Sequence, residues 1–380
     1  MDSFTFYNPT RVHFGKGMIN MLGRELEALG INKCLLIAGG GSIKENGVYE
    51  DVTGNLNAHS ISWTEGWGVQ ANPTLHKVRQ LITQARDEQV DAILAVGGGS
   101  VIDTAKAVAA GFYLEDVWSI FRSEAKLEKA LPVFTVLTLS ATGSEMNSFA
   151  VVSNTETKQK LGTGHPLLFP KVTIIDPSYQ TSLPKQQTVN GALDAMAHVL
   201  EYYFAVREAH STRAIDNSLL KTIVEMTDIL VNDPNDLNAR SNLAWCATLA
   251  LNGISGAGMN GGDWACHTIE HAFSALHPHI AHGAGLGVIF PVWIEYMAER
   301  QPSLFGIWAK EVWGEPSIAM GLNRFRAKIK QWGSVLSLRD LGIKSEELPV
   351  LLDMIMSSTR IGGISKFTRE DVEALLLLAF

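Results

Sequence analysis

Cysteine is scarce in this sequence. Only Cys34, Cys246 and Cys266 occur, and no two of them form a CxxC pair. A disulfide framework and a zinc ribbon both need more cysteines or that spacing, so the sequence predicts neither. A reducing compartment suits such a chain.

Long apolar runs and clusters of basic residues are also absent. No uninterrupted apolar stretch approaches the roughly 18 residues that a membrane-spanning helix needs, and the opening MDSFTFYNPTRVHFGKG lacks the basic start and apolar core of a signal peptide. The 31 Lys and Arg against 39 Asp and Glu give a net charge of -8 without a long basic segment, which argues against nucleic-acid binding. We therefore expect a cytoplasmic protein with neither a membrane nor a nucleic-acid partner.

The 380 residues are more than one ordinary hydrophobic core organises, so two domains are expected. In residues 1–184, short apolar runs such as KCLLIA and DAILAV alternate with amphipathic segments, which predicts an α/β domain with a parallel sheet. In residues 185–380 the β-rich runs largely vanish, which predicts an all-helical domain. Its first expected helices are 185–204, 211–231, 238–256, 263–276 and 287–299.

Two predicted strands lead directly into the same turn. KCLLIA precedes Gly39-Gly40-Gly41-Ser42, and DAILAV precedes Gly97-Gly98-Gly99-Ser100. Glycines let backbone N–H groups approach an anion, and a helix N-terminus favours negative charge, so both turns are candidates for phosphate binding. Each also fits a tight turn without a ligand. Neither has the GxGxxG spacing of the standard dinucleotide fingerprint or the GK[ST] of a nucleotide-triphosphate loop.

Asp194 and His198 stand four residues apart in the apolar helical segment VNGALDAMAHVLEYY. Residues at this spacing share one helix face, so two good metal ligands would project together, although a hydrogen-bonded Asp–His pair fits the pattern too. Further histidines follow at positions 267, 271, 277, 279 and 282. Imidazole nitrogens together with a carboxylate oxygen suit Fe(II) or Zn(II).

The segment from His267 to His271 also matches H-x-x-E-H, a zinc-peptidase pattern in which both histidines bind the metal and the glutamate is the base. A peptidase would leave the two glycine turns and the Asp194/His198 pair without a role. We therefore interpret the match as chance, and metal-dependent peptide cleavage would revive it.

Several segments in a fixed order resemble one family. They are GGGS, NPT, GGGSVID, TLSATGSE, LLFPKVTIIDP, NGALDAMAHVLE, WACHTIEHAFSA and AHGAGLGVIFP. Together they resemble the iron-containing (group III) alcohol dehydrogenases, and among these the NADPH-dependent aldehyde reductase and butanol dehydrogenase branch, over about residues 5–375. The resemblance implies a dehydroquinate synthase-like fold with a Rossmann-like first domain, hydride transfer between a nicotinamide cofactor and a primary alcohol or aldehyde, and a homodimer.

The resemblance also implies which residues act. One metal, Fe(II) or Zn(II), would be held by Asp194, His198, His267 and His282. His271 would lie close to the metal and the substrate, either as a proton relay or as a residue that only orients a ligand. Lys160 is the second candidate catalytic residue, near the nicotinamide. The dinucleotide would contact Gly39, Gly40, Gly41, Ser42, Asn72, Gly98, Gly99, Ser100, Asp103, Thr138, Thr142, Asn147 and Lys160.

The position after the first strand bears on the choice of cofactor. NAD-using members of the family generally carry an acidic residue after this strand, where this chain has Gly39-Gly40-Gly41-Ser42. A carboxylate would repel a 2′-phosphate, whereas glycines and the Ser42 hydroxyl admit it, so we expect NADP(H). A glycerol or polyol dehydrogenase, or another dehydroquinate synthase-like enzyme using NAD, is the alternative. An NADP-binding sensor without activity is the non-enzyme alternative, which the intact set of four ligands disfavours.

Overall fold

The computed structural model describes residues 1–358, 361–364 and 366–380. They form two compact units. Tyr7–Leu183 and Pro234–Ala244 make up the α/β unit, and Met1–Phe6, Pro184–Asp233 and Trp245–Phe380 make up the helical unit. The division falls within one helix, α9 (Leu237–Ala250).

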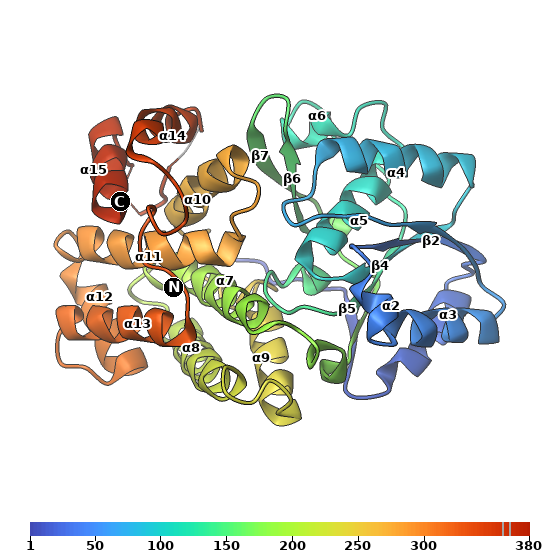
Figure 1. Ribbon diagram of the computed structural model, residues 1–380, viewed down its shortest axis with the longest axis horizontal. Coiled ribbons are helices and arrows are strands. Elements are labelled where there is room, and N and C mark those ends of the chain that lie inside the picture. Colours follow the sequence, from blue (N-terminus) through green and yellow to red (C-terminus); the bar gives the residue numbers. More distant parts are fainter. Residues whose placement is uncertain (359–360, 365) are drawn as a thin grey trace. The chain divides into compact units, whose positions relative to one another are not determined.

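Six parallel strands form the sheet of the α/β unit, in the order β1-β8-β5-β4-β2-β3. Figure 1 labels three of them, β2, β4 and β5. The strands are β1 (Arg11–Phe14), β2 (Lys33–Ala38), β3 (Ser62–Gly66), β4 (Ala92–Gly97), β5 (Val133–Leu137) and β8 (Val172–Ile175). From β2 the chain continues to β3 on one side, and from β4 it continues to β5 on the other. The strand order therefore switches between β2 and β4, the place where open α/β sheets bind ligands.

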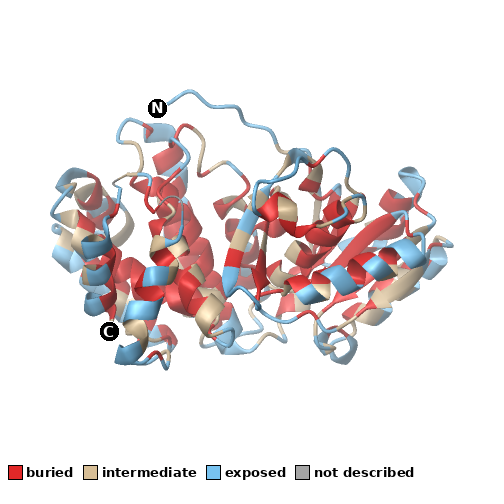
Figure 2. Cartoon of the chain, turned by 90° about the horizontal axis from the view of Figure 1, so that it is seen from above, coloured by how far each residue is buried: buried red, intermediate tan, exposed pale blue. Residues whose placement is uncertain are grey.

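Helices cover both faces of this sheet. Helices α4 (Leu75–Asp87) and α5 (Gly99–Gly111) pack on one face, and α1 (Leu22–Ala28) and α3 (Val48–Ala58) pack on the other. In β2, Leu35 and Ile37 join the first core, and Cys34 and Leu36 join the second. Because successive side chains of a strand point to opposite faces, a strand that is apolar throughout is buried on both. Figure 2 shows the central strands of the sheet as buried. The predicted parallel α/β sheet is confirmed.

Two single helical turns and a hairpin also belong to this unit. The turns are α2 (Ser42–Glu45) and α6 (Trp118–Phe121). Strands β6 (Phe149–Asn154) and β7 (Gln159–Gly164) pair antiparallel as a separate two-stranded sheet. The sequence patterns did not predict this hairpin.

Beyond Pro184, the regular elements of the described residues are helical, as the sequence predicts. They are α7 (Lys185–Tyr203), α8 (His210–Leu230), α9, α10 (Ala265–Leu276), α11 (His282–Ala298), α12 (Pro302–Trp313), α13 (Ile318–Trp332), α14 (Leu348–Met356) and α15 (Arg369–Ala379). Helix α7 packs against α8 and α11, and α10 packs against α11. These contacts bring α7, α10 and α11 together.

Two helices differ from their expected spans by five residues or more at one end. Helix α9 ends at Ala250 and not at residue 256, because the chain then turns through Gly253, Gly258, Gly261 and Gly262, all with left-handed φ angles. Helix α11 begins at residue 282, five residues earlier than expected from the sequence. The glycines of HGAGLG favoured a loop in the sequence pattern, but they lie in the helix.

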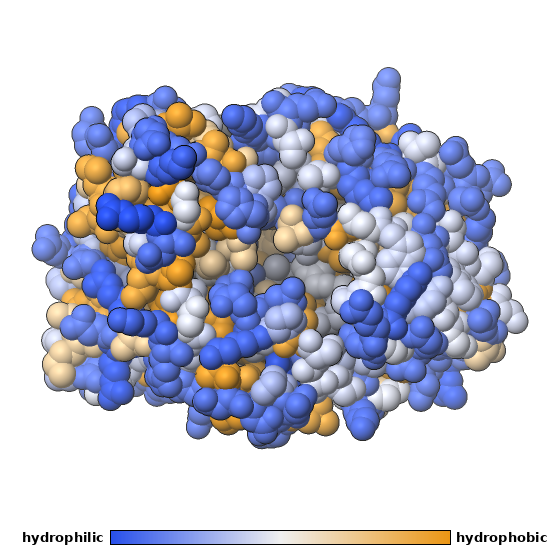
Figure 3. Space-filling model, viewed as in Figure 1, coloured by the Kyte–Doolittle hydropathy of each residue, from blue (hydrophilic) through white to orange (hydrophobic). Residues whose placement is uncertain are grey.

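Among the described residues, no helix combines the length and the apolar character that crossing a membrane requires. The face drawn in Figure 3 is mostly hydrophilic. Large apolar side chains are nevertheless exposed on α14 and α15, including Val350, Leu377 and Leu378.

Candidate functional site

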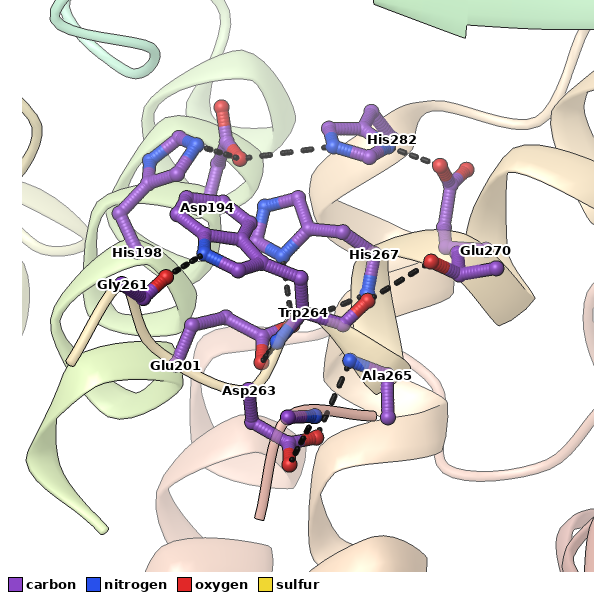
Figure 4. A network of polar contacts seen from close by, with 12 residues as sticks. Asp194, His198, Glu201, Gly261, Asp263, Trp264, Ala265, His267, Glu270 and His282 are labelled. Carbon is purple, nitrogen blue, oxygen red and sulfur yellow. Dashed lines mark hydrogen bonds and ion pairs between the residues drawn. The ribbon is translucent and has the colours of Figure 1, made fainter. Parts of the chain in front are cut away.

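Helix α7 carries two of the four predicted metal ligands. Asp194 and His198 are both buried, and they point to the same side of the helix (Figure 4). Nε2 of His198 lies 3.7 Å from Oδ1 of Asp194. The i,i+4 spacing therefore places both side chains on one face, as the sequence predicts.

The other two predicted ligands come from α10 and α11. His267 lies in the first turn of α10, and His282 is the first residue of α11. Nε2 of His282 is 3.7 Å from Oδ1 of Asp194, and the ring centroids of His198 and His267 are 4.9 Å apart. One ligand atom each from Asp194, His267 and His282 can be chosen so that all three lie within 4.8 Å of one another. We call the four residues, Asp194, His198, His267 and His282, the histidine cluster.

Two glycines beside His282 allow α11 to pack closely against α7 and against the side chain of Glu270. A Cβ atom at Gly283 would lie 1.9 Å from the backbone oxygen of Asn190, so only glycine lets α11 meet α7 one turn before Asp194. A Cβ atom at Gly285 would lie 2.7 Å from Cγ of Glu270. Both distances are well below a normal van der Waals contact. The HGAG segment thus supplies one predicted ligand and the space that it needs.

Three buried atoms of the histidine cluster have no hydrogen-bond partner among the described residues: Asp194 Oδ1, His198 Nδ1 and His267 Nε2. Unpartnered buried polar atoms are costly and uncommon, and a bound cation would remove that cost for the atoms facing it. Tetrahedral bonds of about 2.1 Å place ligand atoms roughly 3.4 Å apart, close to the 3.7 Å separations found around Asp194. The donor set therefore fits a divalent metal such as Fe(II) or Zn(II).

The electrostatics of the cluster also suit a metal. Burial lowers the pKa of His198 to about 3, although the charge of Asp194 acts in the opposite direction. The ring is therefore neutral at physiological pH and keeps a lone pair for coordination.

Two carboxylates contact the outer nitrogens of the cluster. Glu201 Oε1 lies 2.8 Å from Nδ1 of His267, and Oε2 of Glu270 contacts Nδ1 of His282 (Figure 4). No sequence motif identifies Glu201 as a contact of the cluster, and Glu270 belongs in the sequence only to the peptidase pattern. Spacing gives a signal for Glu201, because it follows Asp194 by seven residues and so shares its helix face.

His271 and the peptidase pattern can now be placed. His271 stands beside the cluster, with its ring centroid 5.5 Å from that of His282, and it groups with Glu270 and His282. His267 groups instead with Asp194 and His282. The two histidines of the pattern are thus not found in one ligand group, which does not favour the peptidase interpretation.

His277 lies 3.1 Å from Glu347, outside the cluster.

The predicted cofactor residues lie in the α/β unit. Three of the turns that carry them follow the carboxyl ends of the neighbouring strands β2, β4 and β5. Gly39, Gly40 and Gly41 follow β2, Gly98 caps α5 after β4, and Thr138 and Thr142 follow β5. Lys160 lies in β7, and Asn72 precedes α4. This is the arrangement that dinucleotide-binding sheets use.

Some of these residues have structural contacts of their own. A Cβ atom at Gly99 would lie 2.4 Å from Thr142, so this glycine also lets the turn after β5 pack on α5. Asp103 accepts hydrogen bonds from Ser144 Oγ at 2.6 Å and from the backbone N–H of Val151 at 3.0 Å. Both Asp103 oxygens therefore contribute to holding the chain after β5.

A buried lysine, unnoticed in the sequence, completes this network. Nζ of Lys106 donates to Ser144 Oγ, Asn147 O, Asn147 Oδ1 and Phe149 O at 2.7–3.1 Å. Burial lowers the pKa of Lys106 to about 8, while the charges of Asp103 and Glu145 act to raise it. The amine is therefore charged at neutral pH and holds the segment that carries Asn147.

Comparison with known proteins decides the family. The profile of the iron-containing alcohol dehydrogenases matches residues 9–177, and that of the C-terminal domain of the Fe-containing alcohol dehydrogenase family matches residues 188–380. The chain belongs to the iron-containing alcohol dehydrogenase family. It is therefore an alcohol dehydrogenase of a family that uses a nicotinamide cofactor and iron.

Relatives within the family match along nearly the whole chain. NADH-dependent butanol dehydrogenase A of Clostridium acetobutylicum is 38% identical, with 98% of each protein covered. The NADPH-dependent aldehyde reductase YqhD of Escherichia coli is 32% identical, with 93% of this chain and 92% of the relative covered. The crystal structure of NADH-dependent butanol dehydrogenase A from Thermotoga maritima is 46% identical and superposes with a TM-score of 0.97, covering 100% of this chain and 99% of the other.

Proposed function

We propose that this chain transfers hydride between NADP(H) and a primary alcohol or aldehyde, at a centre where the histidine cluster holds one divalent metal. The observation that supports it most is the pair of buried donor atoms, Asp194 Oδ1 and His267 Nε2, that have no hydrogen-bond partner within the described residues. Nε2 of both His198 and His282 lies 3.7 Å from that Asp194 oxygen. When bound, the metal supplies a Lewis acid for the substrate oxygen, and the nicotinamide gives or takes the hydride. Iron and zinc both fit the donor set, and the metal used is part of what the experiment below measures.

In this proposal His271 passes a proton between solvent and the substrate oxygen. It lies beside His282, and an imidazole titrates near neutral pH. The substitution His271→Asn should therefore change the pH–rate profile while metal binding persists. An unchanged profile would leave His271 with an orienting role only.

The preference for NADP(H) rests on Gly39. The relatives do not decide it, because the butanol dehydrogenases from C. acetobutylicum and T. maritima are NADH-dependent and the E. coli reductase is NADPH-dependent. A Cβ atom at Gly39 would lie 3.5 Å from Val69 O, which is an ordinary van der Waals contact, so a Cβ is accommodated at this position. A carboxylate at this position would meet the 2′-phosphate with like charge.

A matched pair of variants tests this point. Gly39→Asp should lower the ratio of kcat/KM for NADPH over NADH about tenfold or more, whereas Gly39→Asn, of equal size without charge, should change it little. A wild-type enzyme that turns over NADH with the higher kcat/KM would contradict the proposed preference.

The activity itself is tested with a panel of substrates. Protein purified under controlled metal conditions is analysed for bound metal, and NADPH oxidation is followed with aldehydes of rising chain length, with glycerol oxidation as the polyol comparison. Absence of turnover with every aldehyde while metal is bound would defeat the proposal. The cytoplasmic location and the homodimer stay predictions.

A further inference from the structure

Two rings of the histidine cluster share a feature that the third lacks. Nδ1 of His267 faces Glu201 and Nδ1 of His282 faces Glu270. A carboxylate oxygen that faces a ring nitrogen accepts its hydrogen bond when that nitrogen carries the proton, so these contacts favour the proton on Nδ1 of each ring. The lone pair is then on Nε2, the atom that in His282 lies nearest Asp194. Nδ1 of His198, in contrast, has no hydrogen-bond partner among the residues described.

Glu201 is itself fixed in place. It is 1% exposed, and besides the ring it accepts the backbone N–H of His267 at 3.0 Å and that of Trp264 at 2.5 Å. These two amides open α10, where the helix leaves N–H groups without intrahelical partners. One carboxylate on α7 thus holds both the start of α10 and the ring of His267.

Glu270 is fixed by different contacts. It is fully buried, it accepts a hydrogen bond from Ser274 Oγ, and its side chain occupies the space that Gly285 leaves open. It lies on α10 and reaches the first residue of α11. Both carboxylates therefore tie a ring of one helix to a different helix.

We propose that Glu201 and Glu270 are positioning residues, which fix the Nδ1–H tautomer and the orientation of His267 and His282 and thereby set the affinity for the metal. The proposal rests on the proposed function, because it assumes that these rings bind a metal. Carboxylate partners of this kind typically change metal affinity by about 10- to 100-fold when they are removed.

The variants follow from the contacts. In Glu201→Gln one acceptor becomes an N–H donor that faces another N–H, so Co2+ binding should weaken by about 10- to 100-fold. In Glu270→Gln the amide oxygen can still accept from His282 while its nitrogen donates to Ser274, so the loss should be smaller than in Glu270→Leu. Glu347→Gln is the matched control, since Glu347 faces His277 outside the cluster, and it should bind Co2+ as the wild type does.

Two measurements decide the outcome. Competition with a chromophoric chelator gives the affinity for Co2+, and 15N spectra of histidine-labelled, metal-free protein show which ring nitrogen carries the proton. Among the eleven histidine rings, we expect one Nδ1–H signal that changes in Glu201→Gln and a second that changes in Glu270→Leu. Thermal melts identify any variant that does not fold. If Glu201→Gln does not fold, the Glu270 variants alone decide the outcome.

Three results would contradict parts of this account. Unchanged Co2+ affinity in folded Glu201→Gln and Glu270→Leu would overturn the positioning role. A second Co2+ per chain that is lost in Glu270→Gln and His271→Asn would make Glu270 a ligand and overturn its positioning role. Wild-type protein that binds no Co2+ would defeat the proposed function itself, whereas the spectra of the metal-free protein would still show whether the carboxylates set the tautomers.

Discussion

The network around Lys106 and the histidine cluster are both buried, but they differ in how many of their polar atoms have hydrogen-bond partners within the described residues. In the α/β unit, Lys106 has four acceptors and Asp103 accepts from two donors. In the histidine cluster, Asp194 Oδ1, His198 Nδ1 and His267 Nε2 have no partner within the described part of the chain. Asp103 and Asp194 are both buried or half-buried helical aspartates, yet the first holds a loop and the second presents an oxygen that can bind a cation. Pairing, more than residue type, separates a scaffold from a binding site.

The largest expected effect comes from removing a ligand of the cluster. His267→Ala should abolish both metal binding and aldehyde reduction, because it removes one of four donors and the one that Glu201 orients. His279→Ala is the control, since His279 lies outside the cluster, and it should keep metal and activity. Equal retention of metal in the two variants would show that the cluster is not the metal site.

The next effect concerns the space beside His282. Gly283→Ala should destabilise the protein by about 3 kcal/mol and weaken metal binding, because the new Cβ meets the backbone of Asn190 at 1.9 Å. Gly306→Ala in α12 is the opposite control. Nothing lies within 4 Å of a Cβ there, and replacing a helical glycine should stabilise by about 0.5–1 kcal/mol. Urea unfolding measures both, and a tolerated Gly283→Ala would contradict the close approach of α11 to α7.

The network of the α/β unit is tested by replacing Lys106. Lys106→Met should lower the free energy of unfolding by about 2 kcal/mol, because it leaves buried acceptors without their charged donor. The loss should be the same with and without added metal, unlike that of a ligand variant. A loss that depends on metal would mean that the two networks are not independent.

The smallest effect is the pH dependence that Lys106 imposes. Its pKa is lowered from 10.5 to about 8 in the folded protein, so between these values the unfolded chain binds more protons and stability rises with pH. The contribution is lost as the pH falls through about 8. The stability of the wild type should therefore rise relative to that of Lys106→Met from pH 8 to pH 9, by at most about 1.4 kcal/mol. A constant difference between the two proteins would disprove the lowered pKa.

Much of the fold follows from periodicity. Strands such as KCLLIA are apolar at every position because helices cover both faces of the sheet. The hairpin of β6 and β7 was not predicted, since the sequence of β7, QKLGTG, combines polar residues and glycines. Only its pairing with β6 makes this segment a strand. The early start of α11 was not predictable for a related reason. Its glycines are required by the close contacts with Asn190 and Glu270, whereas helix propensity alone would disfavour them.

The site was predictable to the extent that it is local. The spacing of Asp194 and His198 predicts their shared helix face. Their meeting with His267 and His282 depends on how α7, α10 and α11 pack, which no local pattern encodes, so the family resemblance carried that step. Glu201 and Glu270 became visible only through the atoms they contact. The roles of the cofactor residues, among them Lys160 and Asn147, stay predictions.

Removing and restoring the metal of the wild-type enzyme, while NADPH-dependent reduction of an aldehyde is followed, shows whether the reaction needs the metal centre. We expect that chelation abolishes turnover and that Fe(II) or Zn(II) restores it in proportion to one ion bound per chain. Full turnover in protein shown to be free of metal would contradict this expectation.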